Sequence, residues 1–76
     1  MVKWRPCTRK EFIKKLKTIG FTSPEPGGRH FFMRHGAYTL TIPSNKEYSI
    51  PQLKMLLNEI EQGIGRKITI DEWFSL

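Results

Sequence analysis

The feature that most constrains the fold is a pair of six-residue β-type runs, Arg29 to Arg34 and Ala37 to Ile42, separated only by His35-Gly36. Both runs are rich in aromatic and β-branched residues, which favour strands. Histidine and glycine tolerate a positive φ better than most residues do. The two residues between the runs therefore predict a tight hairpin turn.

The register of this hairpin decides which side chains share a face of the sheet. A two-residue loop at His35-Gly36 sets Arg34 opposite Ala37 and Met33 opposite Tyr38. One face then holds Phe31, Met33, Tyr38 and Leu40, and the other holds His30, Phe32, Arg34, Thr39 and Thr41. The first set is apolar and predicts a core face. The second set is mostly polar and predicts an open face that carries His30.

Helix start signals occur at three places in the chain. Each of the stretches Thr8-Arg9-Lys10-Glu11, Ser49-Ile50-Pro51-Gln52 and Thr69-Ile70-Asp71-Glu72 fits the capping-box pattern. Apolar residues at helical spacing follow the first two: Phe12, Leu16 and Ile19, and then Leu53, Leu56, Leu57 and Ile60. Gly20 predicts the end of the first helix, and the second should end near Gly63.

The remaining segments complete a small α+β fold in one domain, residues 1–76. Phe21-Thr22-Ser23 predicts a short first strand, Pro24 to Gly28 a turn, and Ser44 to Tyr48 a loop. The element order is then α-β-β-β-α with a short C-terminal helix. The simplest packing is a three-stranded antiparallel sheet with both main helices on its apolar face.

The charge predicts a polyanionic partner. Thirteen Lys and Arg against seven Asp and Glu give a net charge of +6. Residues 1–34 hold nine basic groups against two acidic ones. Lys10, Lys14 and Lys17 fall on the face of the first helix opposite its apolar stripe, where they form either a binding ridge or an ordinary solvated face. The partner is then a nucleic acid, an acidic protein or an anionic surface.

Segment composition indicates a cytoplasmic protein without a membrane span. The longest apolar run, Phe31-Phe32-Met33, is far too short to cross a bilayer. The stretch Met1 to Pro6 lacks the apolar segment of a secretory signal. Cys7 is the single cysteine, so no intrachain disulfide can form, and a reducing cytoplasm is the expected compartment.

His30 is the strongest catalytic candidate. It follows Gly27-Gly28, where a ligand can approach the backbone closely, and Arg29 and Arg34 could bind phosphate. An imidazole can take the proton of an RNA 2′-hydroxyl or protonate the leaving 5′-oxygen, and this chemistry requires no metal. Phe32 on the same face could stack on a base or simply pack on the sheet. No metal-ligand spacing or nucleotide-binding glycine motif is visible, so we expect no metal and no cofactor.

In their order and spacing, several short motifs resemble the HicA mRNA interferase toxins of bacterial toxin–antitoxin pairs. The likeness runs from Arg9 to Leu16 with Gly20-Phe21, through Gly28-Arg29-His30 and Leu40 to Pro43, to the helix from Leu53 to Ile60 and the turn Asp71-Glu72-Trp73-Phe74. Arg29 stands where the family's Gly-Ser-His signature has Ser. The segment Ser44 to Tyr48 lacks the histidine often found after the proline.

This resemblance implies a fold like that of double-stranded-RNA-binding domains and metal-independent cleavage of mRNA. It implies inhibition by a cognate HicB-type antitoxin, as in a type II toxin–antitoxin pair. The family's catalytic histidine corresponds to His30 and its signature glycine to Gly28. The expected RNA-binding residues are Gly28, Arg29, Arg34, Lys10, Lys14, Lys46 and Phe32. His35 or Lys46 could take the place of the missing histidine.

Two other functions remain open at this stage. One is a non-catalytic RNA-binding module of the double-stranded-RNA type, although its second helix usually opens with clustered lysines and this one contains only Lys54 in its first turns. The other is a protein-interaction domain whose basic face binds an acidic partner, which would need no particular residue at position 30.

Overall fold

The computed structural model describes residues 3–76, so Met1 and Val2 of the polar N-terminal stretch lie outside the described residues. The elements are β1 (Cys7–Thr8), α1 (Arg9–Ile19), β2 (Glu25–Pro26), β3 (Phe31–His35), β4 (Tyr38–Ile42), β5 (Glu47–Tyr48), α2 (Ile50–Ile64) and α3 (Ile70–Ser75). β2, β3 and β4 form an antiparallel sheet in that order, and β1 pairs with β5. The predicted α+β class, with a three-stranded antiparallel sheet and three helices, is confirmed.

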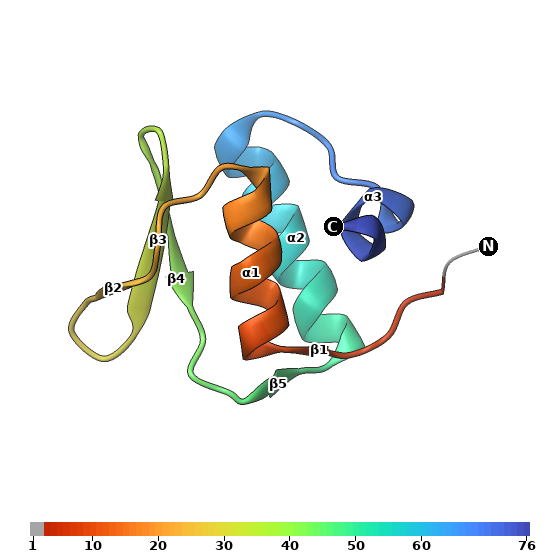
Figure 1. The fold of residues 1–76 in the computed structure, drawn as a ribbon, viewed down its shortest axis with the longest axis horizontal. Coiled ribbons are helices and arrows are strands. Elements are labelled where there is room, and N and C mark those ends of the chain that lie inside the picture. Colours follow the sequence, from red (N-terminus) through yellow and green to blue (C-terminus); the bar gives the residue numbers. More distant parts are fainter. Residues whose placement is uncertain (1–2) are drawn as a thin grey trace.

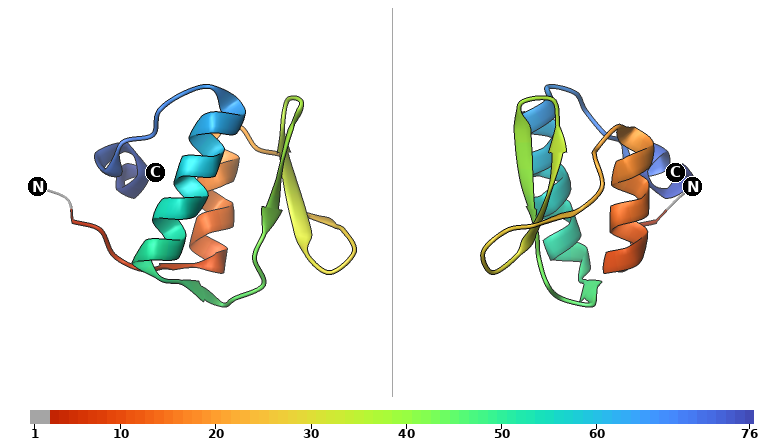
Figure 2. Two further views of the ribbon diagram at one scale, coloured as in Figure 1. Left: turned by 180° about the vertical axis from the view of Figure 1, so that it is seen from behind. Right: turned by 60° about the vertical axis from the view of Figure 1, so that its left-hand side comes forward.

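The molecule is built in layers. The three-stranded sheet lies on one side, α1 and α2 pack side by side next to it, and α3 lies beyond them (Figure 1). The two further views in Figure 2 show that both main helices lie on the same side of the sheet, as predicted. No helix within residues 3–76 combines the length and apolar character needed to cross a membrane.

Local capping fixes where each helix begins. The Thr8 side chain accepts a hydrogen bond from the Glu11 amide, and the Glu11 carboxylate accepts from the Thr8 amide, so the predicted capping box forms. At α2 and α3 only one half of the predicted capping box is found: the Ser49 and Thr69 side chains accept hydrogen bonds from the amides of Gln52 and Glu72. α1 ends at Gly20, where φ is +124°.

The predicted hairpin forms, but its turn lies one residue further along. His35 pairs with Tyr38, and the loop is Gly36-Ala37 rather than His35-Gly36. Gly36 has a φ of +58°, and a turn with positive φ only at its first loop position needs glycine there. Each residue of β3 pairs with a β4 residue two positions further along than predicted, so the side chains keep their predicted faces. Met33 and Leu40 are buried, while Arg34 and Thr39 are exposed.

The predicted first strand is wrong in position. Phe21 is a buried core residue, and the strand is instead Glu25–Pro26, within the segment predicted as a turn. Proline is tolerated there because β2 is an edge strand. Thr22 still lies along β3, since its amide donates to the Arg34 carbonyl at 2.8 Å.

The segment predicted as a loop before α2 contains strand β5. Its residues Glu47 and Tyr48 pair with Thr8 and Cys7 of β1. The Tyr48 ring is fully buried, and its hydroxyl donates to the Pro43 carbonyl at 2.7 Å. This small second sheet ties the start of α1 to the chain entering α2.

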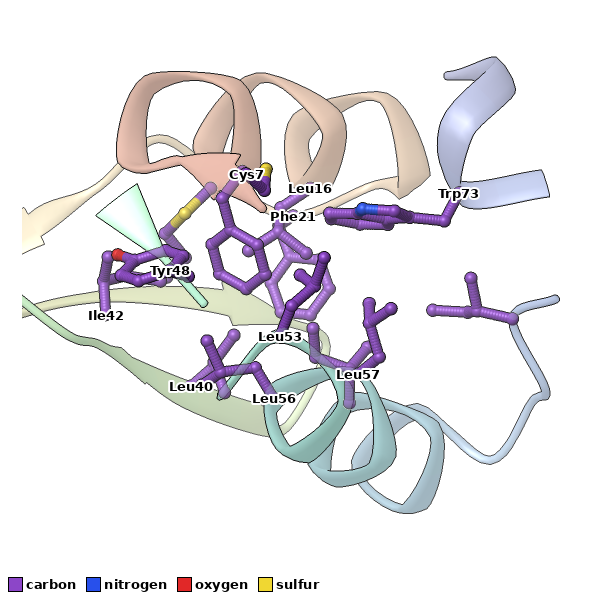
Figure 3. Close-up of a cluster of buried hydrophobic side chains, with 14 residues drawn as sticks. Cys7, Leu16, Phe21, Leu40, Ile42, Tyr48, Leu53, Leu56, Leu57 and Trp73 are labelled. Atoms are coloured by element: carbon purple, nitrogen blue, oxygen red, sulfur yellow. The ribbon is translucent and has the colours of Figure 1, made fainter. Parts of the chain in front are cut away.

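One hydrophobic core lies among the sheet and the three helices (Figure 3). The Phe12 ring packs edge-on against the Tyr48 ring, with 5.1 Å between centroids, and at a tilt against the Trp73 ring, with 5.5 Å between centroids. The buried residues are Cys7, Phe12, Leu16, Phe21, Met33, Leu40, Ile42, Tyr48, Leu53, Leu56, Leu57, Ile60, Ile68 and Trp73. The predicted stripes of both main helices supply much of this core. Burial of this apolar surface stabilises the fold at roughly 25 cal/mol per Å².

Candidate functional site

The face of the three-stranded sheet that points away from α1 and α2 is open. No other element within residues 3–76 covers it in the views of Figures 1 and 2. Arg34, Thr39 and Thr41 on this face are exposed, and Phe32 is half-buried. The sequence predicted this open, mostly polar face correctly.

His30 lies at the end of this face, on the shoulder of the β2–β3 hairpin. The Gly27 amide donates to the His30 carbonyl at 3.1 Å, just beyond the last pair of the β2–β3 ladder, Pro26 and Phe31. His30 lies in the bend directly before β3, and extension of the strand's alternation by one residue would place its side chain on the same face as Phe32. His30 is exposed, as predicted.

Gly28 and Arg29 form the tip of this hairpin, and both are exposed. A Cβ added at Gly28 would meet no atom within 4 Å. At Gly27 it would lie 2.6 Å from the His30 carbonyl oxygen and 3.2 Å from the Phe32 ring. The glycine required for close packing beside His30 is therefore Gly27, while Gly28 leaves the tip uncovered.

Arg34 lies on the open face two residues beyond Phe32, and its guanidinium already has partners. Its guanidinium is 3.6 Å from the Glu25 carboxylate and 5.2 Å from the centre of the Phe32 ring. More than half of the Arg34 side chain is exposed, so this ion pair contributes little to stability. A phosphate could compete for the same guanidinium. Glu25 was not predicted at this site, because its position opposite Phe32 depends on where β2 lies in the folded chain.

Of the two adjacent phenylalanines of β3, Phe31 is the more exposed. Phe31 is 45% exposed and has the Arg9 guanidinium 5.5 Å from its ring centre. Phe32, the predicted stacking residue, is half-buried beneath Arg34. Phe31 was expected on the core face, and its neighbour Met33 is fully buried there. Phe31 differs because it lies at the end of the strand.

A basic pocket of about 380 Å³ is lined by Thr8, Arg9, Lys10 and Lys46, and Arg9 connects it to Phe31, because its guanidinium lies over that ring. The Arg9 amide donates to the Lys46 carbonyl at 2.9 Å, which holds the two basic residues next to each other. The structure thus brings together Lys10 and Lys46, two predicted RNA-binding residues. Arg9 is an addition, for which the excess of basic residues in the first half of the chain was the only signal.

Other basic residues of α1 lie away from this pocket. Lys14 lines a separate hollow of about 300 Å³ that reaches Phe74 and Leu76 near the C-terminus. The Lys15 ammonium donates to the Trp73 carbonyl at 2.8 Å and serves to hold α3. The predicted ridge of lysines is exposed, but only Lys10 lines the basic pocket.

The second histidine is remote from the first. His35 was expected in the turn, but it ends β3 and packs against the Phe21 ring at 5.2 Å. Its imidazole also lies beside Gly20, 3.4 Å from the position of an added Cβ. His30 and His35 are five residues apart in the sequence, or about 17 Å of extended chain. His35 is therefore too far along the strand to share one phosphate with His30.

Other titratable groups of note belong to the core. Burial, with a smaller contribution from Glu11, raises the pKa of the Cys7 thiol to about 11, so the thiol is protonated at neutral pH. Burial also raises the pKa of Tyr48. Within residues 3–76 no three side chains of His, Cys, Asp or Glu gather closely enough to hold a metal ion.

Comparison of the chain with protein-family models, with curated proteins and with solved structures finds no match.

Proposed function

We propose that this protein is an endoribonuclease of the HicA mRNA interferase type that cleaves RNA without a metal ion. The proposal rests on the resemblance in sequence and on the site around His30. The observation that supports it is the exposure of His30 in the bend before β3, beside Arg29 and next to the open sheet face that carries Arg34. A histidine in this position has no packing role, and a large ligand can reach it.

The chemistry follows from the groups at hand. The His30 imidazole takes the proton of a ribose 2′-hydroxyl, and the 2′-oxygen attacks the adjacent phosphorus. A P–O2′ bond forms, the P–O5′ bond breaks, and the imidazolium returns the proton to the leaving 5′-oxygen. Arg29 and Arg34 stabilise the negative charge that grows on the phosphate oxygens. DNA lacks the 2′-hydroxyl and would not be cut.

The Glu25–Arg34 pair fits this mechanism if Arg34 exchanges partners. Both side chains are about half exposed, so water screens their attraction. Two negative phosphate oxygens offer the guanidinium a bidentate contact that is stronger than the single 3.6 Å approach of Glu25. Binding of RNA would then release the Glu25 carboxylate to solvent.

The proposal extends to the fold family, the partner and the compartment. We take the α+β arrangement to be that of double-stranded-RNA-binding domains. The toxin would be held inactive in the cytoplasm by an antitoxin of the HicB type. The excess of basic groups in residues 1–34 suits RNA as the substrate.

Induced expression in bacteria tests this function. The wild-type chain should arrest growth, and the His30→Ala variant should be harmless, because the variant loses the proton-transferring group. Thr39→Ala is a matched control: it truncates another exposed side chain of the same open face, opposite Arg34, and should remain toxic. Circular dichroism should show all three proteins folded. A toxic His30→Ala variant would reject the catalytic assignment.

A further inference from the structure

We infer that Phe31 and the basic pocket of Thr8, Arg9, Lys10 and Lys46 form a subsite for one unpaired nucleotide of single-stranded RNA. Its base would stack on Phe31, and its phosphate would lie in the pocket. This inference rests on the proposed function, since it names the substrate class of that same enzyme.

The cations of the pocket are available to a ligand. The ion pairs found within residues 3–76 join Arg34 to Glu25 and Arg66 to Glu72, so neither involves a residue of the pocket. Two carboxylates lie nearby. Glu11 accepts hydrogen bonds from the Thr8 amide and hydroxyl, at 3.2 and 2.9 Å, and Glu47 is the partner of Thr8 in the β1–β5 ladder. Three positive side chains thus surround a hollow whose lining contains no carboxylate.

The aromatic part of the subsite is Phe31. A phenylalanine that is 45% exposed and carries a guanidinium 5.5 Å from its ring centre offers a flat surface for a base. Stacking on such a ring tolerates any base, and an arginine beside the ring adds attraction to the base and its phosphate. Arg9 belongs to both parts, because it lines the pocket and lies over Phe31.

The position of the subsite relative to His30 indicates a single strand. Phe31 is the first residue of β3 and directly follows His30 in the bend, so the strand's alternation, extended by one residue, points the two side chains to opposite faces of the sheet. An RNA chain that touches both must bend round the end of the sheet within about one nucleotide. A single strand has the backbone freedom for this bend, whereas a base-paired duplex would have to open first. The junction of α1, β1 and β5, from which the pocket residues come, is at the bottom of Figure 1.

Binding measurements in a His30→Ala background test the subsite without cleavage of the probe. Fluorescence anisotropy of a short labelled single-stranded RNA gives Kd, and a duplex of the same sequence is the comparison. Phe31→Leu should weaken single-strand binding by about fivefold to 100-fold, and Phe31→Trp should retain it. Equal or tighter binding of the duplex, or unchanged binding by Phe31→Leu, would overturn the inference.

The contact between the pocket and an RNA phosphate is tested by the salt dependence of binding. Lys46→Gln should reduce the slope of log Kd against log salt by about 0.7, the value expected for one lost contact to a single strand. Lys67→Gln is the charge-matched control, because Lys67 follows the C-terminal end of α2 and lines a different pocket. Lys46 precedes the other end of that helix, about 22 Å away along its 15 residues. If Lys46→Gln leaves this slope unchanged, the pocket does not bind an RNA phosphate.

Cleavage assays separate a failure of the subsite from a failure of the proposed enzyme. One outcome is that the wild-type chain cuts RNA while Phe31→Leu and Lys46→Gln leave the Kd of the His30→Ala background unchanged. The subsite is then wrong, and the proposed enzyme function is retained. If these variants lose binding but the wild-type chain never cuts RNA, the subsite stands and the catalytic function is wrong.

Discussion

At the scale of single residues, Glu25 competes with any phosphate for the Arg34 guanidinium. The two side chains approach within 3.6 Å on the open face, where a substrate would lie. The pair is exposed enough that breaking it costs little free energy. Glu25 also adds a negative charge beside the proposed site, which repels a polyanion.

Glu25→Gln should therefore tighten RNA binding. In the His30→Ala background we expect Kd for single-stranded RNA to fall by up to about fivefold, the equivalent of roughly 1 kcal/mol for an exposed ion pair. Arg34→Gln alone should weaken binding, and Glu25→Gln should give a smaller gain when Arg34 is already replaced. An unchanged Kd for Glu25→Gln would show that Arg34 does not contact the RNA.

The buried thiol of Cys7 makes a separate prediction about stability and pH. Its pKa is about 11 in the folded chain, against an ordinary value of 9.0. Between these values the unfolded chain loses a proton that the folded chain keeps, so stability decreases as pH rises through this window. Urea denaturation at pH 8 and pH 10 should show a decrease larger by about 1 kcal/mol in the wild type than in Cys7→Ala. Equal decreases in both proteins would contradict the burial of the thiol.

At the scale of elements, α2 can pack against the sheet because Gly63 has no side chain. A Cβ at position 63 would overlap the ring of Tyr38 on β4. Tyr38 is itself held near the Phe21 ring at 6.3 Å between centroids. The last turn of α2 and the start of β4 are therefore in direct contact.

Gly63→Ala should destabilise the protein by about 1–3 kcal/mol, because the overlap with Tyr38 outweighs the helix preference for alanine. In a Tyr38→Ala background the same change should become neutral or stabilising, by up to about 1 kcal/mol. Chemical denaturation of the four proteins measures this coupling. Gly28→Ala is the control, since an added Cβ there meets nothing within 4 Å and should change stability by less than about 0.5 kcal/mol. Additive effects at positions 63 and 38 would contradict the contact.

Local signals in the sequence predicted the elements better than their pairing. The caps at Thr8, Ser49 and Thr69 depend on residues within one turn of helix, and all three form. The predicted hairpin turn was one residue too early. Both His35 and Gly36 tolerate a positive φ, but in the folded chain only Gly36 adopts one. The two-residue strands β1 and β5 have no local pattern, since they depend on contacts between segments about 40 residues apart.

The candidate site was predictable only in part for the same reason. Alternation along β3 was enough to place Arg34 on the open face, whereas His30 lies in the bend that precedes the strand. The arrangement of Arg9 over Phe31 beside Lys46 requires the folded chain, because three separate segments supply it. Sequence analysis chose Phe32 for stacking because it shares a face with His30. Exposure at the strand end, which favours Phe31, is not visible in the pattern.

At the scale of the whole molecule, the basic residues serve two different ends of the structure. Lys15 holds the carbonyl oxygens of Trp73 and Leu76, and Arg5 lies over the Phe74 ring at 4.7 Å. These cations stabilise the packing of α3 behind the two main helices. Because these two cations serve the packing of α3, net charge alone overstates the basic surface that is free for a polyanion.

The most direct test of the catalytic role of His30 is cleavage of single-stranded RNA by the purified protein in excess EDTA. The account predicts cutting by the wild type and by Thr39→Ala, and a loss of about 10²–10⁴-fold in rate for a folded His30→Ala variant. Activity that disappears in EDTA, or that survives the removal of this imidazole, would contradict it.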